Sequence, residues 1–220
     1  MVIIGLTGSI GMGKSAAATM LRRLGVQVHD ADAAVHRLLG KGGAAVAMIA
    51  QAFPEVVIDE AIDRGKLGAK VFSDPAALER LEGILHPLVR RSSDRLLASA
   101  ARRRASVVAL DVPLLFETAA DRRYDAVVVV SAPAFLQAQR VLRRPGMTAE
   151  RLRQISTRQI SDSEKRKRAD FVVQTGLGKR DSFVAWRRVL RMLKHRRGRA
   201  WRPGYVGQAG PEILVKRKGR

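Results

Sequence analysis

The stretch Gly8-Ser9-Ile10-Gly11-Met12-Gly13-Lys14-Ser15 decides the fold class of this chain. It follows an apolar run at residues 2–6, typical of a buried strand, and matches the phosphate-loop pattern G-x-x-x-x-G-K-[ST] at every position. The glycines permit turns that aim successive backbone N–H groups at an anion, and a helix starting near Lys14 adds its positive end. Lys14 would contact the β- and γ-phosphates, and the Ser15 hydroxyl would bind Mg²⁺. The alternative is a glycine-rich turn in which Lys14 is merely exposed.

Length and composition are those of a globular protein. The chain has 220 residues and no cysteine. One sizeable α/β domain, with or without an insertion, fits this length. Without cysteine the chain can form neither a disulfide nor a thiol metal site nor a thiol nucleophile, which favours a cytoplasmic location. We expect no signal segment and no membrane helix, because no apolar run approaches about 20 residues.

The net charge of +21 is high and concentrated at one end. Residues 194–220 contain nine Lys or Arg and one Glu. Such charge favours a polyanion as partner, but basic tails rich in Gly and Pro are usually solvated. We therefore expect a flexible basic tail that could bind polyanions weakly, with no requirement for nucleic acid.

The remaining pattern alternates strands with helices. We expect strands at 2–6, 26–29, 106–111 (with 112–117 following), 124–130 and 169–173, and helices at 15–24, 133–144, 148–159 and 179–194. This order predicts an α/β fold with a five-stranded, parallel, doubly wound sheet, which binds ligands at the carboxyl ends of its strands. Residues 33–105 predict a mostly helical insertion, with breaks at several Gly and Pro positions including His86-Pro87, and 163–168 is a charged segment.

Two aspartates follow the second strand and should reach the rim that carries the phosphate loop. Asp32 is the leading candidate for a base that accepts a proton from an acceptor hydroxyl. The competing interpretation is that Asp30 or Asp32 caps the helix that follows. Asp111, which ends the third strand, could hold Mg²⁺ through water or could simply end that strand.

Arginines gather on the helix at 133–144. Arg140, Arg143 and Arg144 lie within five residues and precede a Pro-Gly break. Guanidinium groups match phosphate oxygens, so we expect at least one of these arginines to clamp the nucleotide. The alternative is an exposed basic helix face.

Seven segments in order resemble the dephospho-CoA kinase family. They cover about residues 1–192, and the D-A-D, L-x-H-P and V-P-L-L-F-E pieces in sequence are the most specific. The segments are Val2–Ser15, Val28-His29-Asp30-Ala31-Asp32, Arg64-Gly65-Lys66-Leu67-Gly68-Ala69-Lys70-Val71-Phe72, Leu85-His86-Pro87, Val112-Pro113-Leu114-Leu115-Phe116-Glu117, Gln137-Ala138-Gln139-Arg140 and Ala169-Asp170-Phe171-Val172-Val173.

The resemblance implies transfer of the γ-phosphoryl group of ATP, with Mg²⁺, to the ribose 3′-hydroxyl of dephospho-CoA. By the same resemblance the catalytic residues are Asp32, Lys14 and Arg140, and Ser15 is the metal ligand. The implied nucleotide-binding residues are Gly8, Gly11, Met12, Gly13, Lys14, Ser15, Ala16, Arg140, Arg144 and Thr175. The implied acceptor-binding residues are Asp32, Arg64, His86 and Leu114.

The resemblance also implies a division into parts. A nucleotide-binding core would comprise 1–31, 106–137 and 168–193, a helical acceptor domain 32–105, a small helical lid 138–167, and a basic tail 194–220. Three positions depart from the family pattern: Ala16 replaces a second hydroxyl residue, Pro145 replaces an aspartate, and Thr175 replaces an asparagine near the adenine.

The residues alone leave two other functions open. A nucleoside or nucleotide monophosphate kinase would share the architecture, and a nucleotide-regulated nucleic-acid-binding protein would explain the basic tail. The oligomeric state and the preference for ATP over GTP are open as well.

Overall fold

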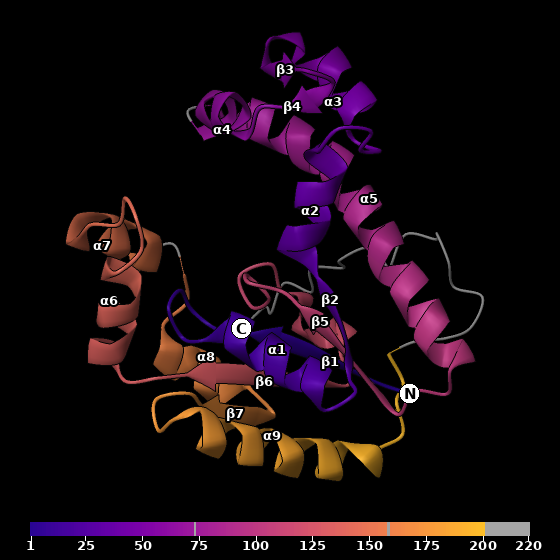
Figure 1. The fold of residues 1–220 in the computed structure, drawn as a ribbon, viewed down its shortest axis with the longest axis vertical. Helices are drawn as coiled ribbons and strands as arrows, with labels where there is room; N and C mark the ends of the chain where they lie inside the picture. Colours follow the sequence, from indigo (N-terminus) through magenta and orange to yellow (C-terminus); the bar gives the residue numbers. More distant parts are fainter. Residues whose placement is uncertain (73, 158, 201–220) are drawn as a thin grey trace, which may run out of the picture.

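A five-stranded parallel sheet forms the centre of the computed structural model, which describes residues 1–72, 74–157 and 159–200. The strand order is β2-β5-β1-β6-β7 (Figure 1), which confirms the predicted α/β fold and parallel sheet. The strands are β1 (Val2–Thr7), β2 (Gln27–Asp30), β5 (Val107–Asp111), β6 (Ala126–Ser131) and β7 (Phe171–Gln174).

Helices cover both faces of this sheet, as expected of a doubly wound fold. Alternate residues of β1 face opposite ways: Ile4 packs in a core with Leu21 and Trp186, whereas Ile3 packs with Leu97. The first core lies beneath α1 (Lys14–Arg23) and α9 (Lys179–Lys194), and the second lies beneath the end of the long helix α5. Because both faces are covered, the strands are continuous apolar runs.

The strand order reverses at β1, and this reversal positions the phosphate loop. β1 pairs with β5 on one side and β6 on the other, while the chain runs from β1 through α1 to the edge strand β2. Ligands of open α/β sheets bind outside the carboxyl ends of strands at such a switch point. Residues 8–13 occupy this position, between β1 and α1.

A helical unit with its own core lies between β2 and β5. Its buried side chains include Ile49, Phe53 and Val56, and it stands above the sheet in Figure 1. It contains α2 (Ala31–Leu39), α3 (Val46–Ala52), a 3-10 turn (Pro54–Val56), the short hairpin β3 (Val57–Ile58) and β4 (Ala61–Ile62), α4 (Arg64–Phe72) and α5 (Pro75–Arg102).

The expected helix break at His86-Pro87 is wrong. α5 is one helix of 28 residues that includes Pro87, and Asp74 caps its start through the N–H groups of Ala76 and Ala77. A proline costs one helical hydrogen bond, but packing at both ends holds this helix together. Leu81 packs in the core of the helical unit and Leu97 packs against the sheet. The helix therefore joins the two parts of the molecule.

Two further segments differ from expectation. The charged segment 163–168 lies in a helix, α8 (Asp162–Arg168), which Ser161 caps by accepting from the Glu164 N–H at 3.2 Å. The apolar residues 112–117 do not prolong β5 and instead form turns that lead to a second 3-10 helix (Ala120–Arg123). Leu115 and Phe116 still pack under the sheet, beside β6.

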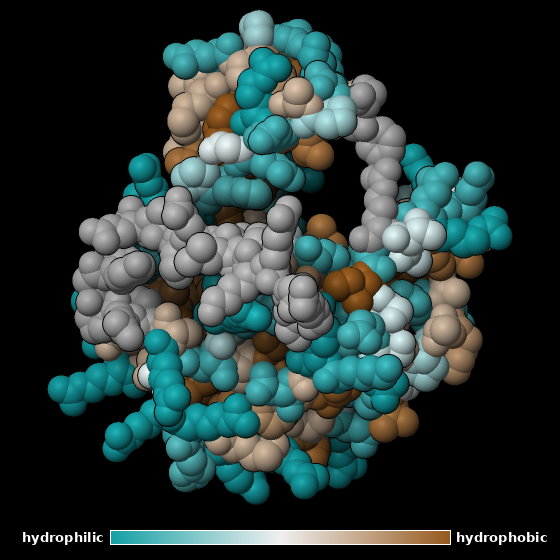
Figure 2. Space-filling view, turned by 180° about the vertical axis from the view of Figure 1, so that it is seen from behind, coloured by the Kyte–Doolittle hydropathy of each residue, from teal (hydrophilic) through white to brown (hydrophobic). Residues whose placement is uncertain are grey.

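The helices α6 (Ala134–Leu142) and α7 (Ala149–Thr157) form a hairpin that projects from the core (Figure 1). At the other end of the chain, α9 ends at Lys194 as expected, and the N–H of Ala200 donates to Asp125 Oδ1 at 2.8 Å. The rest of the basic tail, 201–220, lies outside the described residues. On the face in Figure 2, where grey atoms do not cover it, hydrophilic residues surround separate hydrophobic patches. No described helix is long and apolar enough to span a bilayer.

Candidate active site

The phosphate loop has the backbone that its glycines predict. Gly11 and Gly13 have φ of +76° and +88°, in the left-handed region that favours glycine. Gly13 is the N-cap of α1, so Lys14 and Ser15 are the first residues of that helix. Five backbone N–H groups of the loop and the first turn of α1 donate no hydrogen bond to any of the described residues. They belong to Gly11, Gly13, Lys14, Ser15 and Ala16. These five donors are available to an anion at a helix N-terminus.

Thr175 and Arg140 support the loop from the side. The Thr175 hydroxyl donates to the carbonyl of Met12 at 2.7 Å and accepts from Arg140 Nη1 at 3.1 Å. Arg140 also donates to the Thr175 carbonyl at 2.7 Å and, more weakly, to the Gly11 carbonyl at 3.4 Å. Thr175 and Arg140 thus act on the loop backbone in this structure, while both also face the pocket described below.

Lys14 forms an ion pair with Asp111, the last residue of β5. Their Nζ–Oδ1 distance is 2.5 Å, and Asp111 is buried. Burial raises the pKa of Asp111 above its ordinary value, against the attraction of Lys14, and the nearby Asp30 and Asp32 raise it further. The carboxylate therefore both ends β5 and positions the loop lysine.

The structure distinguishes the two aspartates after β2. Asp30 is the N-cap of α2 and accepts from the Ala33 N–H at 2.9 Å. Asp32 is the second residue of that helix, is exposed, and lines the pocket at the phosphate loop. The capping interpretation is therefore correct for Asp30 and leaves Asp32 available for chemistry.

A pocket of about 840 Å³ is lined by all the predicted nucleotide-binding residues except Met12, whose side chain is buried in the core beneath α1 and α9. The phosphate loop, Asp32, the hairpin α6–α7 and the start of α9 line it. Its lining includes five basic side chains and one acidic side chain, Asp32; the basic ones are Lys14, Arg140, Arg143, Arg144 and Lys179. This size is within the range of small-molecule sites, and the excess of cations suits a polyphosphate.

The three further acceptor-site candidates do not line this pocket. Arg64 begins α4, and its Nη1 donates to His36 Nδ1 at 2.9 Å, because a guanidinium nitrogen can only donate. His86 is exposed on α5, and Leu114, 44% exposed, follows β5. Pro113, which directly precedes Leu114, does line the pocket.

Several residues at the site were not singled out from sequence. Gln137 and Gln159 contact the loop residue Ile10, at 2.9 and 3.1 Å, and Lys179 lies on the pocket wall. Gln137 lies in one of the segments that resemble the family, but its contact and that of Gln159 span 127 and 149 residues, so no local sequence pattern predicts either contact. A lysine at the start of a helix is likewise common on protein surfaces.

The oxygen atoms at the loop suit Mg²⁺. Ser15 offers a hydroxyl at the start of α1, and Asp111 offers a carboxylate at the end of β5. Among the described residues, no group of three or more His, Cys, Asp or Glu could hold a metal alone. Mg²⁺ typically binds through one or two protein oxygens together with substrate phosphates, which fits this arrangement.

Comparison with known sequences places the chain among nucleotide-dependent kinases. Residues 2–179 match the dephospho-CoA kinase family. A dephospho-CoA kinase of Rhodospirillum rubrum is 60% identical over 205 residues, which are 92% of this chain and 96% of that protein. One of Mesorhizobium japonicum is 54% identical over 81% of this chain and 89% of its own length.

Solved structures agree on the architecture. A crystal structure of a Thermus thermophilus protein is 36% identical and superposes with a TM-score of 0.75, covering 87% of this chain and 97% of its own. The dephospho-CoA kinase of Campylobacter jejuni, at 23% identity and a TM-score of 0.59, covers 87% of this chain and 96% of its own and shares the fold.

Proposed function

The chain belongs to the dephospho-CoA kinase family, and on that premise we propose how its phosphate loop, Asp32 and basic hairpin divide the work of phosphoryl transfer. The reaction moves the γ-phosphoryl group of ATP to the ribose 3′-hydroxyl of dephospho-CoA and yields coenzyme A and ADP, the last step of coenzyme A biosynthesis. The pocket at the loop, with five cations around one carboxylate, is the observation that carries the assignment of the site.

The phosphate loop holds the donor. The five available N–H groups of residues 11 and 13–16 bind phosphate oxygens, and Lys14 contacts the β- and γ-phosphates. Ala16 contributes only its backbone, so the missing second hydroxyl costs little. Ser15 would hold Mg²⁺, which when bound neutralises charge on the phosphates. The identity of the donor as ATP is part of this proposal.

Asp32 acts on the acceptor. Its exposed carboxylate faces the same pocket as Lys14, from the first turn of α2. It orients the 3′-hydroxyl and accepts its proton as the new P–O bond forms. The bond from the γ-phosphorus to the bridging oxygen breaks, and ADP leaves with that electron pair.

The hairpin α6–α7 supplies the lid, residues 138–167. Arg143 and Arg144 are exposed on the pocket wall, so their guanidinium groups are free to clamp phosphates and exclude water. Arg140 contributes by supporting the loop, because it donates to the Gly11 carbonyl and to the hydroxyl and carbonyl of Thr175. Thr175 therefore acts on the phosphate loop through Met12 and Arg140, rather than on the adenine.

The helical unit 32–105 holds the acceptor, with Arg64, His86 and Leu114 at its approach. Its separate core makes it a second rigid part beside the nucleotide core of 1–31, 106–137 and 168–193. The enzyme would work in the cytoplasm, which its cysteine-free composition favours. No feature of the described residues favours either alternative function, that of a nucleoside or nucleotide monophosphate kinase or that of a nucleic-acid-binding protein.

An ADP-release assay that compares dephospho-CoA with AMP, CMP and adenosine tests the acceptor assignment. We expect ADP formation to depend on dephospho-CoA. Equal or faster turnover with AMP or CMP would instead identify a monophosphate kinase.

A further inference from the structure

Two glutamines hold one residue of the phosphate loop from opposite ends of the α6–α7 hairpin. Gln137 Nε2 donates to the carbonyl of Ile10 at 2.9 Å. Gln159 Oε1 accepts from the N–H of the same Ile10 at 3.1 Å. Gln137 lies on α6, and Gln159 follows α7, so each glutamine lies where one end of the hairpin joins the core.

The bond from Gln137 determines how the next amide is oriented. Ile10 and Gly11 share one planar trans peptide, in which the carbonyl and the N–H point in opposite directions. Gly11, at φ +76°, lacks the side chain that would restrict rotation of this peptide. With the Ile10 carbonyl held by Gln137, the Gly11 N–H is held in one direction, and it is one of the donors available to phosphate.

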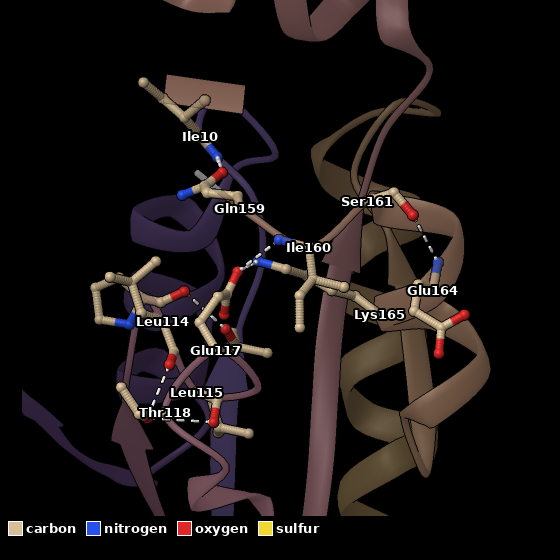
Figure 3. A network of polar contacts seen from close by, with 12 residues as sticks. Ile10, Leu114, Leu115, Glu117, Thr118, Gln159, Ile160, Ser161, Glu164 and Lys165 are labelled. Carbon is tan, nitrogen blue, oxygen red and sulfur yellow. Dashed lines mark hydrogen bonds and ion pairs between the residues drawn. The ribbon is translucent and has the colours of Figure 1, made fainter. Parts of the chain in front are cut away.

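Gln159 is itself anchored by a buried ionic group (Figure 3). The next residue, Ile160, donates its N–H to Glu117 Oε1 at 3.0 Å. Lys165 of α8 is fully buried with its Nζ 2.9 Å from the same oxygen. Their geometry is that of an ion pair rather than a directed hydrogen bond, since Lys165 Nζ finds no hydrogen-bond partner among the described residues. The far end of the hairpin is thus attached to the segment that follows β5.

We propose that Gln137 and Gln159 are positioning residues that hold the phosphate loop in its nucleotide-accepting form and make that form depend on the seating of the lid. The inference rests on the proposed function of the loop and the lid. Neither glutamine needs to touch the reacting atoms. Each acts through the Ile10 peptide, so its loss should weaken binding of the triphosphate more than it slows the chemical step.

The two hydrogen bonds have opposite polarity, which gives a matched test. Position 159 must accept a hydrogen bond and position 137 must donate one. Gln159→Glu keeps an acceptor, whereas Gln137→Glu loses the donor, although both add one negative charge. Gln159 lines the pocket and Gln137 does not, so charge repulsion alone would make Gln159→Glu the worse variant. Gln159→Met and Gln137→Met remove the bonds without charge.

The probe is MgATP, titrated calorimetrically into the full-length chain without acceptor. We expect both Met variants and Gln137→Glu to weaken binding about two- to tenfold, as expected for one hydrogen bond, and Gln159→Glu to stay within about twofold. With dephospho-CoA present, the KM for ATP should rise by the same factor while kcat changes little. The exposed Gln154 of α7 makes no side-chain hydrogen bond among the described residues, so Gln154→Met is the control.

Amide exchange of Ile10, followed by NMR, tests the contact itself. It should accelerate in Gln159→Met and remain slow in Gln159→Glu. Unchanged MgATP affinity in both Met variants would overturn the inference, even if their thermal stability fell. Equal loss of MgATP affinity in Gln159→Glu and Gln159→Met would also overturn it. If the wild-type chain bound MgATP but did not phosphorylate dephospho-CoA, the proposed function would fail while the affinity comparison still decided the role of the glutamines.

Discussion

Lys14 and Asp111 form an ion pair at the base of the phosphate loop, with 2.5 Å between Nζ and Oδ1. The pair joins the first residue of α1 to the last residue of β5, so the lysine is held before any phosphate arrives. Asp111 is 3% exposed, and burial outweighs the attraction of Lys14 in setting its pKa, which is raised. The pair therefore positions Lys14 for the phosphates, and the buried Asp111 carboxylate lowers the free energy of unfolding at neutral pH.

Replacing Asp111 should raise the stability of the protein at neutral pH and lower its activity. The folded chain holds the Asp111 proton more tightly than the unfolded chain, so this group lowers the free energy of unfolding as pH rises from its ordinary pKa of 3.8 through the raised folded value. At pH 7 we expect Asp111→Asn to melt at a higher temperature than wild type, with the difference shrinking toward pH 4. We expect kcat/KM for ATP to fall about tenfold, since Lys14 loses its partner. A lower melting temperature at pH 7 would contradict this assignment of the pKa.

Asp32 and Asp30 form a matched pair for testing the base. Asp32→Asn should lower kcat by about 100- to 10,000-fold, the range of general-base catalysis, and leave MgATP affinity within about twofold. Asp30→Asn keeps the helix cap, because Asn and Asp cap equally well, and should retain activity. The comparison is made by steady-state kinetics with dephospho-CoA. Wild-type turnover in Asp32→Asn would refute the base assignment.

The stability of the fold should depend on Lys165 and Glu117 being present together. Glu117→Gln leaves the wholly buried ammonium without a counterion, and we expect a loss of about 3–5 kcal/mol in the free energy of unfolding. The double variant Lys165→Met/Glu117→Gln should recover most of that loss in urea titrations. An additive double variant would mean that the two side chains do not interact.

The same pair predicts a pH dependence of opposite sign to that of Asp111. Burial alone would raise the pKa of Glu117, but the Lys165 ammonium and the backbone N–H of Ile160 together hold it below its ordinary value of 4.5. Its contribution to stability is therefore present above pH 4.5 and is lost as pH falls through the lower folded pKa. The difference between wild type and Glu117→Gln should accordingly narrow in acid.

Thr175 should matter through its hydroxyl. Thr175→Val keeps the shape but removes the bonds to Met12 and Arg140, and we expect MgATP to bind about fivefold more weakly, as for about 1 kcal/mol. Thr175→Ser keeps the hydroxyl and should stay within about twofold. Trp186 lines the pocket, so fluorescence in a Trp201→Phe background can report the affinity. Equal affinity of the Val and Ser variants would exclude a role for the hydroxyl.

The parts of this molecule that depend on local pattern could be predicted from sequence. The phosphate loop, its strand and its helix follow from glycine positions and apolar periodicity, and so does the parallel sheet. Asp32 could be placed at the right rim, but the spacing of Asp30 and Asp32 could not tell cap from pocket. That distinction depends on which carboxylate reaches the Ala33 N–H.

What depends on distant contacts could not be predicted. The helix α5 continues through Pro87 because two separate cores hold its ends, and a local rule about proline cannot include them. Lys165 reads as one more charge in a basic segment, yet it is fully buried against Glu117. The contacts of Gln137 and Gln159 with Ile10 likewise exist only once the hairpin has folded back onto the loop.

Phosphate transfer to the ribose of dephospho-CoA is tested most directly by identifying the product. The chain is incubated with MgATP labelled at the γ-phosphorus and with dephospho-CoA, and the product is analysed by mass spectrometry and ³¹P NMR. We predict labelled coenzyme A carrying the new phosphate on the 3′-oxygen, formed in equal amount to ADP and lost in Asp32→Asn. Label released as inorganic phosphate, or label on an oxygen other than the 3′-oxygen, would contradict the account.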